Sequence, residues 1–584
     1  MRKIKYFKAV WWVVILVSLG SPQHYVQAQT LSQIQQPKRI QTVPQSPPIP
    51  APLPTKKKPL NLPPQHQAPE IPSQRHSPTK ARVTKFRFQG NKVFSDRQLE
   101  AVVAAYTGKE ITFGQLLEAR SAITKHYIEQ GYITSGALIP LTGNQLIRQV
   151  DGGLIVTIQI VEGKVEEINI SGSDRLSKYV RSRLKAATSP VLNTNHLLEA
   201  LRLLQTDPLI ETISANLDAG SKVGGTLLNV QVKAQQPFRV ETAVDNERSP
   251  AIGTFQQRIQ MGHANLLGLG DQLSLGYRHT QGSDAIGTSY SIPLNSRNGT
   301  VQLSYTDISS DIVEHPFNQL DIISDARVYE FSFRQPLLRQ ATAQATKDFA
   351  LGLSAARLES ETSVEDAPFP LSRGADERGR TKVSAVRFFQ EWNRRSGKEV
   401  FLARSQFSLG IGAFDATINN TAPDSRFFAW RGQTAWLRHL GKTTLLLRAD
   451  LQLADRPLVP LEQFGLGGTT TVRGYRQDAL LSDNGFLASA ELRIPVWKRP
   501  TGELQVIPFV DVGTAWNNDS ANNELVAPEL GTLLSVGLGL QYQLSDRFSA
   551  RIDWGIPLVP IDTNSSSGSW QEKGLHFGVR YQLF

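Results

Sequence analysis

An arginine in a glycine-rich segment is the residue of this sequence that most clearly raises a chemical question. Residues 464–475 read FGLGGTTTVRGY, with Arg473 between Val472 and Gly474. The glycines let the backbone fold tightly and approach other segments closely. If the segment folds into a confined space, the guanidinium of Arg473 needs a carboxylate, because an unpaired buried cation is costly.

Three carboxylates are candidates for that partner. The segment LQVIPFVDVGTAW alternates as a strand, and Phe509, Asp511 and Gly513 share one face of it. An acid between an aromatic residue and a glycine suits a planar bidentate donor. Glu491 and Asp553 lie on the corresponding faces of neighbouring strands and are rival partners. The alternation of side chains along these strands favours Asp511 as the partner of Arg473, but it does not exclude Glu491 or Asp553.

Signatures of catalysis are absent from the sequence. The ten histidines show no HExxH or HxxxH spacing, and the serines show no GxSxG elbow. There is no cysteine, which excludes a disulfide framework, a thiolate zinc site and a cysteine nucleophile. The segment LLGLGD at 266–271 resembles a phosphate-binding loop, but it precedes a strand and is interpreted as a hairpin turn. We expect no enzyme, no catalytic residue, no cofactor and no metal site.

The N-terminus predicts export. Basic residues precede the apolar run AVWWVVILVSL at 9–19, and the small-residue site VQA follows at 26–28. Residues 1–28 are therefore predicted to be a cleaved signal peptide. No later run reaches the ~18–20 apolar residues of a transmembrane helix. The mature chain is expected to be soluble or to span a membrane as a β-barrel, which also satisfies every backbone polar group.

Residues 29–80 carry thirteen prolines, and their charges are almost all basic. This composition cannot bury a core and predicts an extended, proline-rich linker. A nucleic-acid tail is the alternative for a chain with net charge +11 and pI near 9.6. An exported chain meets anionic lipid or cell wall first, so no nucleic-acid partner is expected.

Two small α/β modules are predicted next. Residues 81–162 read as a strand, two helices and two strands, and Thr112 with Gln115 forms a capping box at the start of the second helix. Residues 163–235 repeat the order β-α-α-β-β. Two tandem copies of one module are the economical interpretation.

From residue 236 to 584 the helical period disappears. Segments of about ten residues alternate between apolar and polar side chains, as in LLSVGLGLQYQL at 533–544. A soluble sandwich also alternates, but the signal peptide and the mixture of charge, Gly and Gln on the second face favour a membrane barrel with a wet lumen. Strands of about 9–11 residues predict roughly 16 of them. The predicted fold class is two α+β modules followed by an all-β transmembrane barrel.

A family resemblance rests on two motifs. PLEQFGLGGTTTVRGY at 460–475, together with FVDVG at 509–513, resembles the barrel signature of two-partner secretion transporters. These outer-membrane pores export hemolysin-like and filamentous-hemagglutinin-like proteins, and the two modules resemble their POTRA domains. The resemblance covers residues 82–584. It implies that Val472, Arg473, Gly474 and Tyr475 anchor a loop folded into the pore, with Arg473 paired to Asp511.

The resemblance also implies location and partners. It places the barrel in the outer membrane of a Gram-negative-type bacterium and the modules in the periplasm, where they capture an unfolded exoprotein client that leaves without ATP. Membrane lipid and the barrel-assembly machinery are further implied partners, and a monomer is expected. A client could add as a strand to an exposed sheet edge. The edge residues implied are Thr134, Ser135, Ala137, Leu138, Ile139, Ile213, Ala215 and Leu217.

Several alternatives stay open at this point. The edge segments could be ordinary sheet interior. The chain could be an insertase of the same superfamily, although insertases usually carry more modules, or a passive porin, which has no use for peptide-binding modules. Two features depart from the family pattern. Residues 31–36 are the only short candidate for a plug helix, and Phe584 is out of phase with the apolar set ending at Leu583.

Overall fold

The computed structural model describes residues 80–139, 147–150, 153–420, 423–518, 530–545, 547–561 and 568–583. This part of the chain divides into two compact units at Gln235–Gln236. The predicted signal peptide, nearly all of the predicted linker, the plug-helix candidate and Phe584 lie outside the described residues. Within them, no helix has the length and apolar character needed to cross a membrane.

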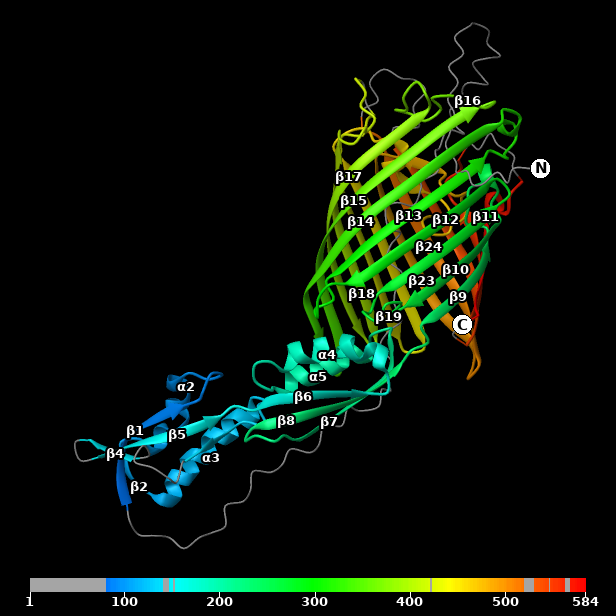
Figure 1. Ribbon diagram of the computed structural model, residues 1–584. Coiled ribbons are helices and arrows are strands. Elements are labelled where there is room, and N and C mark those ends of the chain that lie inside the picture. Colours follow the sequence, from blue (N-terminus) through cyan, green and yellow to red (C-terminus); the bar gives the residue numbers. More distant parts are fainter. Residues whose placement is uncertain are drawn as a thin grey trace. The chain divides into compact units, whose positions relative to one another are not determined.

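The first module is a mixed sheet with two main helices (Figure 1). Its elements are β1 (Lys80–Gln89), α2 (Asp96–Val102), β2 (Lys109–Thr112), α3 (Phe113–Glu129), β3 (Gly136–Leu138), β4 (Ile147–Val150) and β5 (Gly153–Val161). The sheet order is β2-β1-β5-β3, and β4 also pairs with β5. The short strands β2 and β4 are additions to the predicted order β-α-α-β-β. Four residues are too few to show a period of two.

The second helix of this module begins as the sequence predicts. The Thr112 hydroxyl accepts from the Gln115 backbone N–H at 3.2 Å, and the Gln115 side chain accepts from the Thr112 N–H at 2.9 Å. This reciprocal capping box satisfies two of the free N–H groups at the helix start. One face of α3 then packs on the sheet through Ala119, Ile123 and Tyr127, none of which is exposed.

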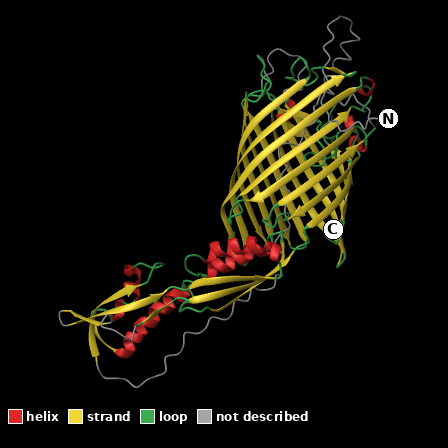
Figure 2. Cartoon of the chain, viewed as in Figure 1, coloured by secondary structure: helices red, strands yellow, loops and turns green. Residues whose placement is uncertain are grey.

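The second module has the predicted order β-α-α-β-β. Its elements are β6 (Lys164–Ser171), α4 (Asp174–Thr188), α5 (Thr194–Gln205), β7 (Ile210–Ala219) and β8 (Gly225–Ala234). The sheet order is β6-β8-β7, so β7 pairs only with β8 in the described chain. Both helices lie on one face of this sheet (Figure 2). Their apolar stripes, which include Val180 and Leu201, form its core.

The long strands from residue 238 onward form one closed antiparallel barrel in the described part of the chain, which confirms the predicted fold. Its strands are β9 (Phe238–Asp245), β10 (Gln256–Ala264), β11 (Gln272–Thr280), β12 (Ser283–Pro293), β13 (Thr300–Asp311), β14 (Ile322–Ala341), β15 (Ala345–Val364), β17 (Arg380–Ser396), β18 (Glu399–Ile411), β19 (Phe427–Leu440), β20 (Thr443–Ala454), β23 (Asn484–Arg499), β24 (Gly502–Trp516), β25 (Leu530–Leu544), β26 (Phe548–Pro557) and β27 (Leu575–Gln582). The two-residue β16 (Ala367–Pro368) pairs antiparallel with the end of β15, and β27 closes onto β9. The described barrel therefore has sixteen long strands. The segment 266–271 lies in the turn between β10 and β11, as interpreted.

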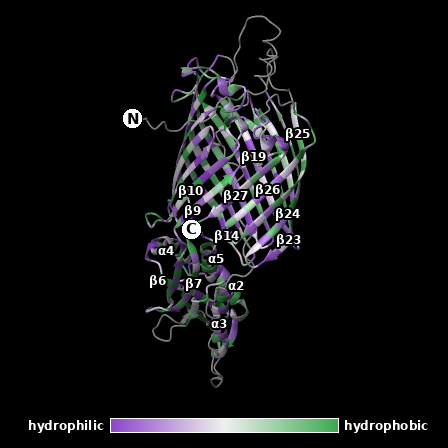
Figure 3. Cartoon of the chain, turned by 90° about the vertical axis from the view of Figure 1, so that its right-hand side faces the viewer, coloured by the Kyte–Doolittle hydropathy of each residue, from purple (hydrophilic) through white to green (hydrophobic). Residues whose placement is uncertain are grey.

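Alternation along the strands separates an outer from an inner face. On β25, Val536, Leu538 and Leu540 are 38%, 53% and 44% exposed, while Ser535 on the other face is fully buried. Figure 3 shows hydrophobic and hydrophilic residues alternating along the barrel strands. Val579 on β27 is exposed in the same way. An apolar outer band of this kind is what a bilayer requires.

Connectors of very different length join the strands. At the end where Phe238 begins the barrel, turns are as short as residues 441–442 and 500–501. At the opposite end the connector between β20 and β23 spans residues 455–483. It contains β21 (Phe464–Leu466) and β22 (Leu480–Ser482), which pair with each other. We call residues 464–482 the inner hairpin, because its contacts lie on the inner face of the barrel.

Candidate functional site

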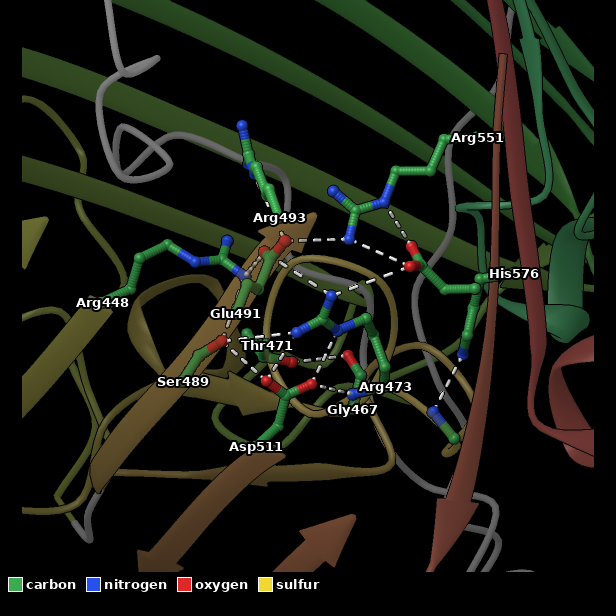
Figure 4. Close-up of polar contacts among 12 residues, drawn as sticks. Arg448, Gly467, Thr471, Arg473, Ser489, Glu491, Arg493, Asp511, Arg551 and His576 are labelled. Carbon is green, nitrogen blue, oxygen red and sulfur yellow. Dashed lines mark hydrogen bonds and ion pairs between the residues drawn. The ribbon is translucent and has the colours of Figure 1, made fainter. Parts of the chain in front are cut away.

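Arg473, near the tip of the inner hairpin, is held by the carboxylate of Asp511 on β24 (Figure 4). Nε of the arginine lies 2.7 Å from Oδ2, and Nη2 lies 2.8 Å from Oδ1. The backbone N–H of Arg473 also donates to Oδ2 at 3.1 Å. Only 1% of the arginine side chain and none of the aspartate side chain is exposed. The contact between Arg473 and Asp511 that strand alternation favoured is therefore present. It has the bidentate geometry that guanidinium and carboxylate prefer.

Two wall residues complete the seat of the guanidinium. Ser489 stands opposite Asp511 in the register of β23 and β24. Its hydroxyl donates to Asp511 Oδ1 at 2.6 Å and accepts from Arg473 Nη2 at 3.4 Å. The Phe509 ring centroid lies 3.6 Å from the guanidinium carbon, a cation–π contact. Both groups come from rigid strands, so the wall side of the site is preorganised.

The rival carboxylates also face the arginine. Nη1 of Arg473 lies 3.5 Å from Glu491 and 3.9 Å from Asp553. Burial by itself lowers the pKa of the arginine, but the hydrogen bonds and charge of Asp511, with the charges of the two rivals, raise it above its ordinary value. The arginine therefore stays charged, and its partners form one cluster with Asp511 at the centre.

Three further arginines belong to the same cluster, and the sequence reasoning missed them. Glu491 lies within 3.8 Å of each: Arg551 at 3.0 Å, Arg448 at 3.4 Å and Arg493 at 3.8 Å. Arg551 also pairs with Asp553 at 2.7 Å. Their inward phase was visible in the sequence. Their convergence on one carboxylate depends on strand register, which cannot be read from the sequence.

The glycine of the VRGY motif lets the hairpin touch the wall. Gly474 has a φ of +91°, and a Cβ there would lie 2.9 Å from the backbone of Gly555 on β26. Its N–H donates to His576 Nε2 at 3.2 Å. Gly513 has a similar role, since a Cβ there would lie 2.8 Å from Leu466 and 3.0 Å from Val472. No other residue type permits approaches this close.

The remaining motif residues fix the hairpin at both sides of the arginine. Val472 is fully buried in an apolar cluster with Phe464 and Leu466. The Tyr475 hydroxyl lies 2.9 Å from the carbonyl of Leu534 and 2.8 Å from that of Val559. All four residues singled out in VRGY thus contact the wall, the hairpin core or a neighbouring connector.

The two segments expected at sheet edges lie there in the described modules. Strands β3 and β7 each pair on one side only, with β5 and β8. In β7, Ile213 and Ala215 are buried and Leu217 is half-buried, so these side chains face the module core and the backbone forms the edge. The interior alternative does not apply to these strands.

The edge at β3 is shorter and partly occupied. The N–H of Ala137 donates to the side chain of Thr124 on α3 at 3.0 Å, and the Ser135 hydroxyl accepts from Gly163 at 2.9 Å. Leu138 is 46% exposed, while the flanking Thr134 and Ile139 are half-buried. The ten-residue β7 is therefore the more open template.

Metal chemistry finds no support in the described ranges, where no three His, Asp or Glu side chains come together as a metal site would require. The charged cluster around Arg473 consists of arginines and acids already paired with one another. These ion pairs hold the inner hairpin against the barrel wall.

Comparison with known proteins agrees with this geometry. Residues 224–542 match the model of the haemolysin secretion/activation protein ShlB/FhaC/HecB family, and residues 81–163 match the ShlB-type POTRA domain. The outer membrane transporter CdiB of Dickeya dadantii is 21% identical over 74% of this chain and 76% of its own length. The heme/hemopexin transporter protein HuxB of Haemophilus influenzae is 22% identical over 80% of this chain and 81% of its own length.

Solved structures share the fold. CdiB from Escherichia coli superposes with a TM-score of 0.64 at 19% identity, covering 89% of this chain and 94% of that one. BamA from Haemophilus ducreyi, lacking POTRA domains 1–3, gives 0.51 at 14% identity, covering 86% of this chain and all of that one. The family match spans more than half of the chain. The chain therefore belongs to the ShlB/FhaC/HecB family: it is an outer-membrane transporter of two-partner secretion, with its POTRA region in the periplasm, and it exports a partner protein rather than catalysing a reaction.

Proposed function

We propose that this transporter exports a large exoprotein of the hemolysin or adhesin type, and that the inner hairpin closes its pore until a client arrives. The observation that carries the proposal is the buried pair of Arg473 and Asp511. It joins the connector between β20 and β23 to strand β24 of the barrel wall.

The pair suits a gate because it is a two-state element. A buried guanidinium that makes two hydrogen bonds to one carboxylate is stable only while that carboxylate stays in place. Withdrawal of the hairpin exposes Arg473 and Asp511 together, and water then solvates both. A client that binds the open state better shifts this equilibrium, and no other energy source is required.

Capture of the client is the second part of the proposal. An extended polypeptide adds to the edge of β7, where main-chain hydrogen bonds give affinity with little demand on sequence. The exposed face beside that edge is polar, with Ser214 and Asn216 turned outward. The β3 edge adds a shorter second template.

Single-channel recording in planar bilayers tests the gate. We expect Arg473→Ala and Asp511→Ala to give similarly altered, unstable conductance, and the double variant to add little, because the two residues act as one lock. A result in which neither substitution changes conductance contradicts the gate.

The chain offers a matched control for this recording. Arg404 on β18 pairs with Glu391 on β17 at 2.6 Å and stacks on Phe389 at 4.1 Å, as Arg473 pairs with Asp511 and stacks on Phe509. This ion pair joins two wall strands and not the hairpin. Arg404→Ala should therefore leave the closed state intact.

Photo-crosslinking in secreting cells tests capture. A benzophenone amino acid in place of Asn216 on β7 should crosslink to the exported protein. The same group at Glu167, on the opposite edge strand β6, should not. Equal labelling from both edges, or none from Asn216, would remove strand addition at β7 from the proposal.

A further inference from the structure

The base of the long connector is fixed to a different part of the wall from its tip. Leu458, Val459 and Leu461 are completely buried. They pack in one apolar cluster with inner-face residues of β12, β13, β14, β15, β17 and β19. The inner hairpin has its own cluster, with Leu487, Ala515 and Leu533 of β23, β24 and β25. The connector therefore spans the lumen from one wall to another.

A buried ion pair accompanies the base. Glu462 Oε1 lies 2.6 Å from Nη2 of Arg387 on β17, and these side chains are only 4% and 1% exposed. Nε and Nη1 of Arg387 have no hydrogen-bond partner among the described residues. The guanidinium therefore depends on Glu462 for compensation, and losing that carboxylate leaves a buried charge unpaired. In the barrel order, β18, β19, β20 and β23 separate Arg387 from Asp511.

The two ends of the connector are also clipped together. The carboxylate of Asp483, at its far end, accepts from the Leu458 N–H at 2.8 Å and from the Gln463 side chain at 3.1 Å. The Gln452 side chain donates to the carbonyls of Glu462 and Asp483 at 2.9 and 3.1 Å. We call these contacts among Gln452, Leu458, Glu462, Gln463 and Asp483 the clasp. The inner hairpin begins and ends next to it.

We infer that Arg387 and Glu462 form a second anchor, which holds residues 458–463 against the wall while the inner hairpin alone swings between closed and open positions. This inference rests on the proposed gate and adds its hinge. The hinge lies at Gln463–Phe464 and at Ser482–Asp483, where the clasp ends and the hairpin begins. Arg387 and Glu462 are positioning residues, since they act on the pore by fixing the base of the connector.

The second anchor has a mechanical consequence. Breaking the Arg473 lock frees residues 464–482 but leaves the base inside the barrel, so the open pore stays partly filled. Breaking the Arg387–Glu462 pair releases the base as well. The two locks therefore control different segments, and probes in those segments can tell them apart.

The absence of cysteine from the chain makes such probes simple. Single substitutions Leu461→Cys in the base and Val472→Cys in the hairpin place thiols at positions with no exposure. Each is combined with Arg473→Ala, with Glu462→Gln or with neither, in the full-length protein in liposomes. The measurement is the labelling rate with a water-soluble maleimide. Val400→Cys, fully buried in an apolar cluster of β18, β19 and β20 that contains no residue of the connector, reports general unfolding of the barrel.

We expect Arg473→Ala to raise labelling of the Val472→Cys site by about tenfold or more, as local opening exposes it, while the Leu461→Cys site stays protected. Glu462→Gln should raise labelling of the Leu461→Cys site. Glu462→Asp, which keeps the charge, should restore part of its protection. The Val400→Cys site should stay unreactive throughout.

The outcomes separate the two ideas. If Arg473→Ala leaves the Val472→Cys site protected, the gate itself fails. If Arg473→Ala exposes both sites, the hairpin and base move together and the second anchor fails. If Glu462→Gln leaves the Leu461→Cys site protected, the ion pair does not hold the base, which also overturns the inference. If Glu462→Gln prevents folding, Arg387→Lys supplies the weaker perturbation, with partial exposure expected at the Leu461→Cys site alone.

Discussion

Two parts of the barrel's inner face use similar residues in opposite ways. The first, which we call the docked face, consists of Ser489, Glu491, Phe509, Asp511, Ser535 and Gly555. The second, the open face, consists of Gln260, Ser274, Gly276, Gly287, Ser289, Ser304 and Thr306. Each set shares one side of its strands by register. All residues of the docked face are buried, whereas those of the open face are half-buried or exposed.

Glycine shows the contrast most directly. A Cβ on Gly555 would lie 2.5 Å from the backbone N of Gly474, so the inner hairpin uses the space. A Cβ on Gly276 would meet nothing within 4 Å. Both glycines face inward on barrel strands. The difference lies in what crosses the lumen in front of them.

Charge distinguishes the docked face from the open face in the same way. Around Asp511 the wall carries acids and arginines that pair with one another and with the hairpin. The rows of the open face that contain Ser274 and Gly276 are small and mostly uncharged. The docked face binds one segment of the chain, whereas the residues of the open face stay half-buried or exposed.

The largest expected effect comes from removing the centre of the docked face. Asp511→Ala strands the buried guanidinium of Arg473 and should cost about 3–5 kcal/mol, nearer the lower end because Glu491 and Asp553 remain close. Urea unfolding in detergent, followed by tryptophan fluorescence, measures the loss. Ser289→Ala on the open face should change stability by no more than about 0.5 kcal/mol.

A double substitution checks the reason for that loss. Arg473→Met with Asp511→Leu removes both charges and should be less destabilising than Asp511→Ala alone, because no buried ion is left unpaired. If Asp511→Ala costs no more than Ser289→Ala, the two faces do not differ energetically as their burial implies.

A smaller effect should follow from adding one methyl group. Gly555→Ala pushes a Cβ into the Gly474 backbone and should cost about 1–3 kcal/mol, the usual range for overpacking. The hairpin cannot dock fully, so channel openings should become more frequent. Gly276→Ala is the matched substitution on the open face, and both stability and conductance should stay as in the unmodified protein. Equal behaviour of the two variants would contradict the contrast.

The fold itself could be predicted from the sequence. Alternation over about ten residues is a strong signal because it repeats through every barrel strand, and one residue of slip would turn a whole face outward. It placed Asp511 inward and Val510 outward, and Val510 is 42% exposed. The family motifs, VRGY and FVDVG, added the hairpin.

Shorter features could not be predicted in this way. β2 and β4 have four residues each, and β21 and β22 have three, too few to show a period. Glu462 stands in a connector with no periodicity, so nothing in the sequence linked it to Arg387. Both partners had to be placed by the fold before the pair could be seen.

The sequence could favour one inward acid but could not settle the choice. Alternation favours Asp511 without excluding Glu491 or Asp553, and only strand register and the position of the hairpin set Asp511 nearest to Arg473. Alternation likewise marks Ser289 and Ser489 as inward without showing that one is half-buried and the other buried. Whether an inner face is covered depends on segments distant in the chain.

The smallest expected effect concerns ion selectivity, and it tests whether the open face lines the conducting path. Ser289→Glu adds a negative charge where the neighbouring inner-face residues are small and polar, so folding should be unaffected. In the Arg473→Ala background, the cation-to-anion permeability ratio should rise by roughly twofold, because a charge on a lumen wall concentrates its counterions. Reversal potentials in a salt gradient measure the ratio, and Ser289→Gln is the neutral control. An unchanged ratio would mean that ions pass elsewhere, and the open face would then be only an unfilled part of the wall.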